Sequence, residues 1–325
     1  MLRARRRTQV RPSFIAVAIV FAIYFIFFAF RSDDDDDNGH EKPKTQPEPV
    51  KVEKPESKVR QDLVVASMKG DDTSWLYEHF PSWHKSIYVV NDETAELTVR
   101  KNKGRESMVY LTYIIDNYDK LPDYMLFIHS LRYQWHNDDP LYDGVPVLRN
   151  FQLPYLEKEG YVNARCAWTL GCPSEIKPFQ DTHRQDVHVG EYYKNGFMEL
   201  FPGAKVPEAV GVSCCAQFGV TRSKVRERPR SEYERYREWL LETPLADDLS
   251  GRIMEYSWHM IFNKEAVHCP TAQDCYCNVF GLCDLTCNRA GDCEGRYTLP
   301  PYSTMPQGWP EKGWDGKPMK KPDPE

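Results

Sequence analysis

The chain has 325 residues, and its 48 acidic against 42 basic side chains give a formal net charge of −6. The chain therefore lacks the excess of positive charge that binding a nucleic-acid backbone requires, and nucleic acid is excluded as a partner. Aromatic residues make up 13% of the chain, which permits a sizeable core. The length beyond residue 60 corresponds to one large domain with a small appendage.

The N-terminal segment predicts a membrane anchor. An uncharged apolar run over 13–30 is near the shortest length that spans a bilayer as one helix. Arginines crowd residues 1–12 and Asp33–Asp37 follow the run, so the positive-inside rule leaves a basic tail in the cytoplasm and places the body in the lumen. A cleaved signal peptide is the alternative, but the end of the run offers no small-x-small cleavage site.

These features predict a single-pass type II membrane protein of the Golgi or endoplasmic reticulum, with the membrane as its first partner. Residues 31–60 are charged and rich in proline, and they read as a disordered stalk. The tail over 300–325 has a similar composition and the same prediction.

The predicted luminal domain, 61–265, begins with strands and helices in alternation. A continuous apolar strand suits a position buried on both faces of a parallel sheet, and strand–helix–strand units favour a doubly wound, mostly parallel α/β sheet. The expected strands are 63–66, 87–90, 124–128 and 210–220, and the expected helices are 72–80, 104–118, 231–241 and 250–262.

Polar side chains follow the first strands, where open α/β sheets bind their ligands. Asp71 and Asp72 follow the first strand, and Asp92 follows the second. We expect these three carboxylates to contact a bound cofactor.

The loop after the third strand is rich in metal-ligating side chains, namely His129, His136, Asp138 and Asp139. Histidine and carboxylate together can hold a divalent cation, so manganese or magnesium is one interpretation. The other is a polar, hydrogen-bonded loop in which the two aspartates cap the chain that follows.

Lys103 and Arg105 stand just before the helix expected over 104–118. Cations at a helix N-terminus attract an anion such as a diphosphate. The alternative is a solvated basic turn.

One late helix carries the candidate catalytic residues Arg252, Glu255 and His259, spaced so that they share a face. Glu255 beside an arginine is a candidate base for accepting a proton from a hydroxyl group. A structural ion pair is the alternative. Trp135, His136 and Trp258 are the expected walls of a substrate site.

All ten cysteines lie beyond the predicted anchor, where a luminal compartment permits disulfides. We expect three disulfides, rather than a zinc site, among the last six in a disulfide-rich segment over 266–299. Cys166 and Cys172 are spaced for a local loop, and Cys214 and Cys215 are expected to bond elsewhere rather than to each other. The last six are Cys269, Cys275, Cys277, Cys283, Cys287 and Cys293.

Long stretches of the chain resemble a fungal family catalogued as domain of unknown function 3431. They are VVASMKGDDTSWL (64–76), NKGRE (102–106), YLTYIIDNYDKLPDYMLFIHS (110–130), RYQWHNDDPLYDG (132–144), GYVNARCAWTLGCPSEIKP (160–178), CCAQFGVTRSKVRERPRSEYERYREWL (214–240) and SGRIMEYSWHMIF (250–262).

That family in turn is similar to glycosyltransferases of the GT-A nucleotide-sugar type, which implies a nucleotide sugar as donor. GT-A enzymes usually end the strand corresponding to 124–128 in Asp-x-Asp, which binds manganese or magnesium. Here that strand ends in His129-Ser130. Basic residues are then expected to neutralise the leaving group in place of a metal.

The sequence thus predicts a glycosyltransferase-like enzyme that moves a sugar to a luminal carbohydrate or glycoconjugate acceptor. Two other interpretations stay open: a non-catalytic module that binds carbohydrate or protein, and a luminal metal-dependent enzyme of a biosynthetic pathway.

Overall fold

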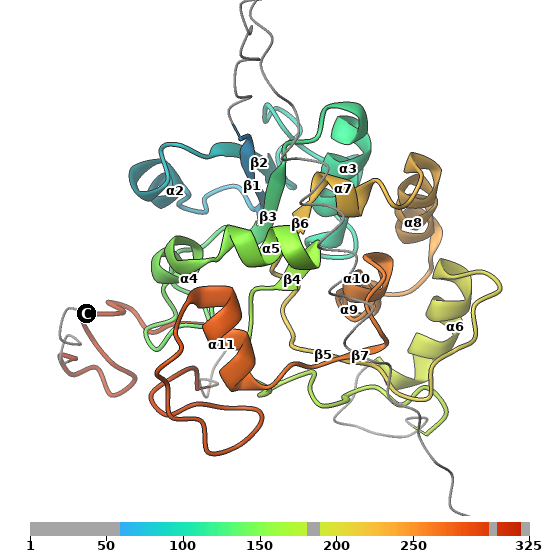
Figure 1. Cartoon of the computed structure of the whole chain (residues 1–325). Coiled ribbons are helices and arrows are strands. Elements are labelled where there is room, and N and C mark those ends of the chain that lie inside the picture. The colour runs from blue at the N-terminus through green and yellow to red at the C-terminus, as the bar shows by residue number, and fades with distance from the viewer. Residues whose placement is uncertain (1–58, 181–188, 299–303, 320–325) are drawn as a thin grey trace, which may run out of the picture. The chain divides into compact units, whose positions relative to one another are not determined.

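Five strands form the central sheet of the protein, which a computed structural model describes over residues 59–180, 189–298 and 304–319 (Figure 1). The order is β2-β1-β3-β6-β4; four strands run in one direction and β6 runs against them. The α/β class and the mostly parallel sheet are therefore confirmed. The strands are β1 (Gln61–Ser67), β2 (His84–Val89), β3 (Tyr124–His129), β4 (Tyr161–Asn163) and β6 (Phe218–Thr221).

Helices cover both faces of this sheet because consecutive side chains of β1 point to opposite sides. Val64 belongs to a core with α3, α8 and α9, whereas Leu63 and Val65 pack with α4, α5 and α11. The helices are α2 (Ser74–His79), α3 (Ser107–Asn117), α4 (Gly144–Asn150), α5 (Leu153–Glu159), α6 (Gly190–Leu200), α7 (Arg222–Val225), α8 (Arg230–Glu242), α9 (Asp247–Glu255), α10 (Trp258–Ile261) and α11 (Ala272–Phe280), with a 3-10 turn η1 at Tyr118–Lys120.

Two of the predicted late elements are each divided in the structure. The strand expected over 210–220 becomes β5 (Gly211–Val212), which pairs with β7 (Val267–His268) in a second small sheet, and β6 in the main sheet. The helix expected over 250–262 stops at Glu255, and α10 begins only at Trp258. The turn between the two helices separates His259 from the face that carries Glu255.

Five disulfides pair all ten cysteines, so the predicted disulfides are confirmed while their expected partners are corrected. Cys166 bonds to Cys275 and Cys172 bonds to Cys269, so these two do not close a local loop together. The chain after β4 passes over α11, which brings Cys166 to that helix and Cys172 to the segment before it. Only two disulfides, Cys277–Cys283 and Cys287–Cys293, lie within the last six cysteines.

Cys214 and Cys215 bond to each other, against our expectation. The chain turns here through positive φ values of 89° at Cys215 and 48° at Ala216. This turn between β5 and β6 brings the two neighbouring side chains together.

The C-terminal region is more integrated than the sequence indicated. Helix α11 contributes Tyr276 and Val279 to one of the two cores. In the stretch 304–319, Trp309 packs on Tyr142 and donates a hydrogen bond of 2.7 Å to the carbonyl of Leu141. This stretch therefore packs on the domain, where the sequence predicted a disordered tail. In the part of the chain that the structure describes, no helix is long and apolar enough to cross a bilayer. The predicted anchor and the predicted stalk up to residue 58 lie outside that part.

Candidate functional site

A pocket of about 660 Å³ opens at the carboxyl ends of β1 and β3. Ser67 lines it at the end of β1, Asp71 lines it in the loop that follows, and His129 lines it at the end of β3. The chain continues from β1 to β2 on one side, whereas β3 lies on the other. This is a topological switch point, where open α/β sheets form their ligand sites. Cys215, whose carbonyl pairs with the His129 ring at 3.0 Å, and Glu255 also line the pocket.

Of the three predicted cofactor-binding aspartates, only Asp71 lines the pocket. Its carboxylate accepts hydrogen bonds from the backbone of Met68 at 2.8 Å and from the Ser130 hydroxyl at 2.5 Å, which ties the loops after β1 and β3 together. Asp72 is exposed and accepts from the backbone of Ser74 at the start of α2. Asp92 pairs with Lys69 at 3.0 Å outside the lining. Both act on local backbone rather than in the pocket.

The two candidate cations also separate. Lys103 donates hydrogen bonds to the carbonyls of Thr243 and Leu245, so it holds the connection between α8 and α9. Arg105 lines the pocket and makes an exposed ion pair of 3.5 Å with Asp247. A Cβ built on Gly251 would stand 2.5 Å from Cγ of Arg105. The absence of a side chain at Gly251 thus lets Arg105 cross α9 at the pocket edge.

Glu255 is the best-placed carboxylate of the pocket. Its Oε2 pairs with Arg252 at 3.3 Å, and its Oε1 accepts the backbone N–H of Cys215 at 2.5 Å. Burial raises the pKa of Glu255, while Arg252 and the Cys215 N–H act in the opposite direction. The side chain is 13% exposed, so it is held in place yet open to a ligand.

Glu106 is a second carboxyl group in the pocket, and the sequence did not single it out as a site residue. Burial and the nearby charge of Glu255 raise its pKa to about 8. At neutral pH Glu106 is therefore protonated and able to donate a hydrogen bond. Burial raises the pKa of both Glu106 and Glu255, and the charge of Glu255 adds to the shift of Glu106.

One wall of the pocket is a stack of three rings. The His129 and His136 rings lie 4.2 Å apart, as do the Trp135 and His136 rings. Burial lowers the pKa of His129 to about 4 and that of His136 well below its usual range, so both rings are neutral at pH 7. The predicted substrate residues Trp135 and His136 are thus brought to the pocket, where uncharged rings suit a sugar or a base.

The other predicted residues of the late helices lie in the core. Trp258 is 1% exposed and packs on Phe218 and Tyr110. His259 is fully buried, and its Nε2 pairs with the carbonyl of Ala266 at 3.1 Å. Neither lines the pocket, so the structure does not bring the predicted substrate residue Trp258 or the predicted catalytic residue His259 to this candidate site. Their apolar spacing belongs to core packing.

The four predicted metal ligands do not converge. Asp138 accepts the backbone N–H groups of Cys166 and Ala167 and the hydroxyl of Tyr276. Asp139 accepts the backbone N–H groups of Leu141 and Asp143. These aspartates fix loops, as the alternative interpretation proposed, and the two histidines stack without them.

The remaining metal-ligating chemistry is limited. Among the described residues, the one group of three that comes close enough for a metal ion joins Glu255 with Cys214 and Cys215, whose sulfurs bond to each other. The lining as a whole has more carboxyl groups than arginines: Asp71, Glu106, Asp247, Asp248 and Glu255 against Arg105 and Arg252. Carboxylates of this kind accept hydrogen bonds from sugar hydroxyls.

A family model described as protein of unknown function (DUF3431) matches residues 63–278, which include every pocket residue named above. No curated protein matches the chain, and no solved structure does.

Proposed function

This chain belongs to the DUF3431 family, and from its pocket we propose that it is a glycosyltransferase-like enzyme. The proposed reaction moves a sugar from a nucleotide sugar to a hydroxyl group of a carbohydrate or glycoconjugate acceptor. The observation that carries the proposal is Glu255, a base candidate that is 13% exposed, lines the switch-point pocket and is held by Arg252 and the Cys215 N–H.

The sheet supports a nucleotide-sugar fold of the GT-A type. Three parallel strands carry the pocket loops at their carboxyl ends, and one reversed strand, β6, lies beside β3. The donor would lie across the ends of β1 and β3, against the neutral ring stack of Trp135, His136 and His129. The pocket volume lies within the range of small-molecule sites.

The residues divide the proposed chemistry between them. Glu255 would accept the proton of the acceptor hydroxyl as that oxygen bonds to the anomeric carbon. Arg105 and Arg252 would stabilise the negative charge that develops on the departing diphosphate. Glu106, protonated at neutral pH, would donate a hydrogen bond to the donor rather than repel its phosphates.

The pocket does not fit a protein-bound manganese or magnesium ion. The strand end that would supply an acidic pair presents His129 and Ser130, and Asp71 is engaged by Ser130. Asp138 and Asp139 are engaged by backbone N–H groups elsewhere. We therefore assign the neutralisation of the leaving group to the two arginines.

We also propose that the enzyme works in the Golgi or endoplasmic reticulum, tethered by residues 13–30. The five disulfides support this location because an oxidising lumen preserves them.

Donor turnover by the full-length chain, purified in mild detergent, tests the proposal. Uridine, guanosine and cytidine sugar nucleotides are incubated with the wild-type chain and Glu255→Gln, and release of the nucleotide is measured. Loss of a general base typically lowers the rate about 100-fold or more, and we expect this loss in Glu255→Gln with donor binding retained. Glu238→Gln, a change on the exposed face of α8, is the matched control. Equal turnover in wild type and Glu255→Gln would remove Glu255 from the mechanism.

A further inference from the structure

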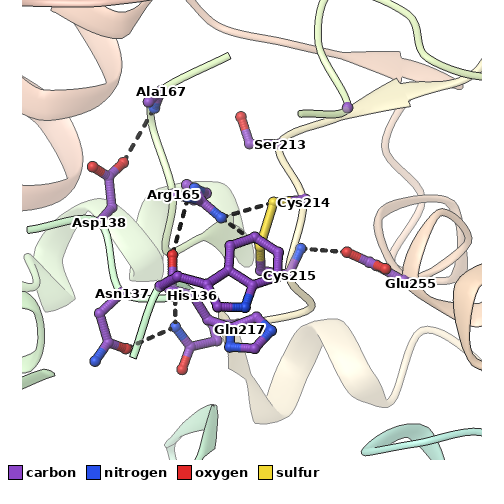
Figure 2. Close-up of a disulfide and its surroundings, with 12 residues drawn as sticks. His136, Asn137, Asp138, Arg165, Ala167, Ser213, Cys214, Cys215, Gln217 and Glu255 are labelled. Carbon is purple, nitrogen blue, oxygen red and sulfur yellow. Dashed lines mark hydrogen bonds between the residues drawn. A yellow bond between two sulfur atoms is a disulfide. The ribbon is translucent and has the colours of Figure 1, made fainter. Parts of the chain in front are cut away.

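Cys214 and Cys215 form a disulfide that lies between Arg165 and Glu255 (Figure 2). Cys215 lines the pocket and Cys214 lies behind it, with 4% and 1% of their surfaces exposed. A small reactant in the pocket can therefore approach the sulfur of Cys215, and the sulfur of Cys214 would be the leaving group.

A buried arginine contacts both sulfurs. Arg165 is 2% exposed, and its Nη1 donates to Sγ of Cys214 at 2.7 Å and to Sγ of Cys215 (Figure 2). The guanidinium also donates to the carbonyl of Trp135, and its carbon lies 3.8 Å from the centre of the Tyr297 ring and 5.6 Å from the centre of the Trp135 ring.

Within the described residues, Arg165 forms no ion pair with a carboxylate, and its Nε has no acceptor. Burying a cation without a counter-ion is costly. Glu255 has a carboxylate oxygen within 4.8 Å of both sulfurs and acts on this cation from beyond ion-pair distance. A thiolate beside Nη1 would supply negative charge in direct contact. The neighbouring arginine stabilises the thiolate over the thiol, whereas the charge of Glu255 opposes it.

We propose that Cys214–Cys215 is a redox-reactive disulfide and that a small dithiol entering the pocket reduces it. One thiolate of the dithiol attacks Sγ of Cys215, the bond between the two cysteines breaks, and Cys214 leaves as a thiolate beside Arg165. The second thiol of the reductant then attacks the mixed disulfide, forms a cyclic disulfide and releases Cys215. Two electrons pass from the dithiol to the protein.

The other four disulfides lack this arrangement. The structure shows no arginine donating to their sulfurs within the described residues. Cys283 is exposed, so its bond to Cys277 is more accessible than the pair in the pocket. If solvent access alone set the rate of reduction, a change at Arg165 would alter no disulfide. If the arginine sets it, the change should slow only the reduction of Cys214–Cys215.

Reduction also reaches the proposed base. The Cys215 N–H donates to Glu255, and the Cys215 carbonyl accepts from the ring of His129 at 3.0 Å. Freeing the sulfurs releases the turn that presents these two groups. This coupling rests on the proposed function, and we expect donor turnover to change between the oxidised and reduced forms.

Timed alkylation with peptide mass spectrometry tests the reactive pair without any substrate. The full-length chain is treated with dithiothreitol, free thiols are trapped, and the rate of reduction is obtained for each disulfide. Because the rate of exchange follows the pKa of the leaving thiol, we expect reduction of Cys214–Cys215 to slow about 10-fold in Arg165→Gln. Arg165→Lys should retain most of the rate, and the other four rates should stay unchanged. Equal rates in wild type and Arg165→Gln would overturn the proposal.

A second measurement needs only the wild-type chain, in case Arg165→Gln does not fold. After reduction, the pH dependence of alkylation gives the thiol pKa of Cys214, which we expect to lie about one unit or more below the ordinary value of about 8.5. A value at or above 8.5 would overturn the proposal. If the alkylation results hold and no sugar nucleotide is turned over in either redox form, the proposed function fails while the reactive disulfide stands.

Discussion

Replacing Glu106 by Gln should stabilise the protein at alkaline pH and leave its stability unchanged near pH 4.5. Burial and Glu255 raise the pKa of Glu106 from its usual 4.5 to about 8. Between these values the unfolded chain has lost the proton that the folded chain keeps. Wild-type stability should therefore fall as pH rises from about 4.5 to 8, since the folded state binds more protons than the unfolded one.

The size of the effect follows from the same shift. One pKa unit corresponds to about 1.4 kcal/mol, so the rise from 4.5 to about 8 can lower the free energy of unfolding by at most about 5 kcal/mol. Water in the open pocket screens the charge, and we expect about 3 kcal/mol at pH 8.5. Gln retains the shape and the donor of the protonated acid but cannot ionise.

Urea unfolding of the full-length chain in detergent, repeated from pH 4.5 to 9, gives the difference in unfolding free energy between Glu106→Gln and wild type. Burial lowers the pKa values of His129 and His259 to about 4. As pH falls below about 6.5, these two histidines gain protons in the unfolded chain before they do in the folded chain, which lowers the free energy of unfolding. Their contribution is common to both proteins and cancels in the difference. Glu93→Gln, an exposed carboxyl after β2, should give a flat difference. A flat difference for Glu106→Gln as well would refute the account of this carboxyl group.

Two further changes test individual contacts. Gly251→Ala places a Cβ 2.5 Å from Cγ of Arg105 and should displace that side chain. Calorimetry should then show a nucleoside diphosphate binding about 10-fold more weakly, as expected for loss of one charge-assisted hydrogen bond. Additive losses of affinity in Gly251→Ala/Arg105→Gln would show that the glycine acts by another route. Tyr276→Phe removes the donor of a 2.6 Å hydrogen bond to the buried carboxylate of Asp138. This change should lower the free energy of unfolding by about 1–3 kcal/mol in urea unfolding. Tyr77→Phe, on the exposed face of α2, is the control, and an equal loss of stability in both variants would contradict this role of Tyr276.

The sheet was predictable because its signal is local. The apolar run 124–128 and the shorter runs before it correspond to β3, β1 and β2, and the strand-end rule led directly to Asp71 and His129 in the pocket. Spacing also indicated Arg252 and Glu255 correctly as neighbours on one helix.

The failures have two causes: partners that are distant in sequence, and local backbone turns that a residue pattern does not specify. Asp138 resembled a metal ligand because its true partners, the N–H of Cys166 and the hydroxyl of Tyr276, lie far along the chain. The spacing of His259 assumed an unbroken helix, but the turn after Glu255 rotates it into the core. The pairing of Cys214 with Cys215 depends on positive φ at Cys215, which a sequence pattern does not specify.

Binding of sugar nucleotides to the pocket is the most direct test of this account, measured as the change in melting temperature of the full-length chain with and without manganese. At a ligand concentration about 100 times its Kd, binding contributes about 2.7 kcal/mol, which raises the melting temperature by about 5–10 °C. We predict such a rise for at least one sugar nucleotide, retained in Glu255→Gln, reduced in Arg105→Gln and present without the metal. An unchanged melting temperature with every sugar nucleotide, with manganese or without it, would contradict the account.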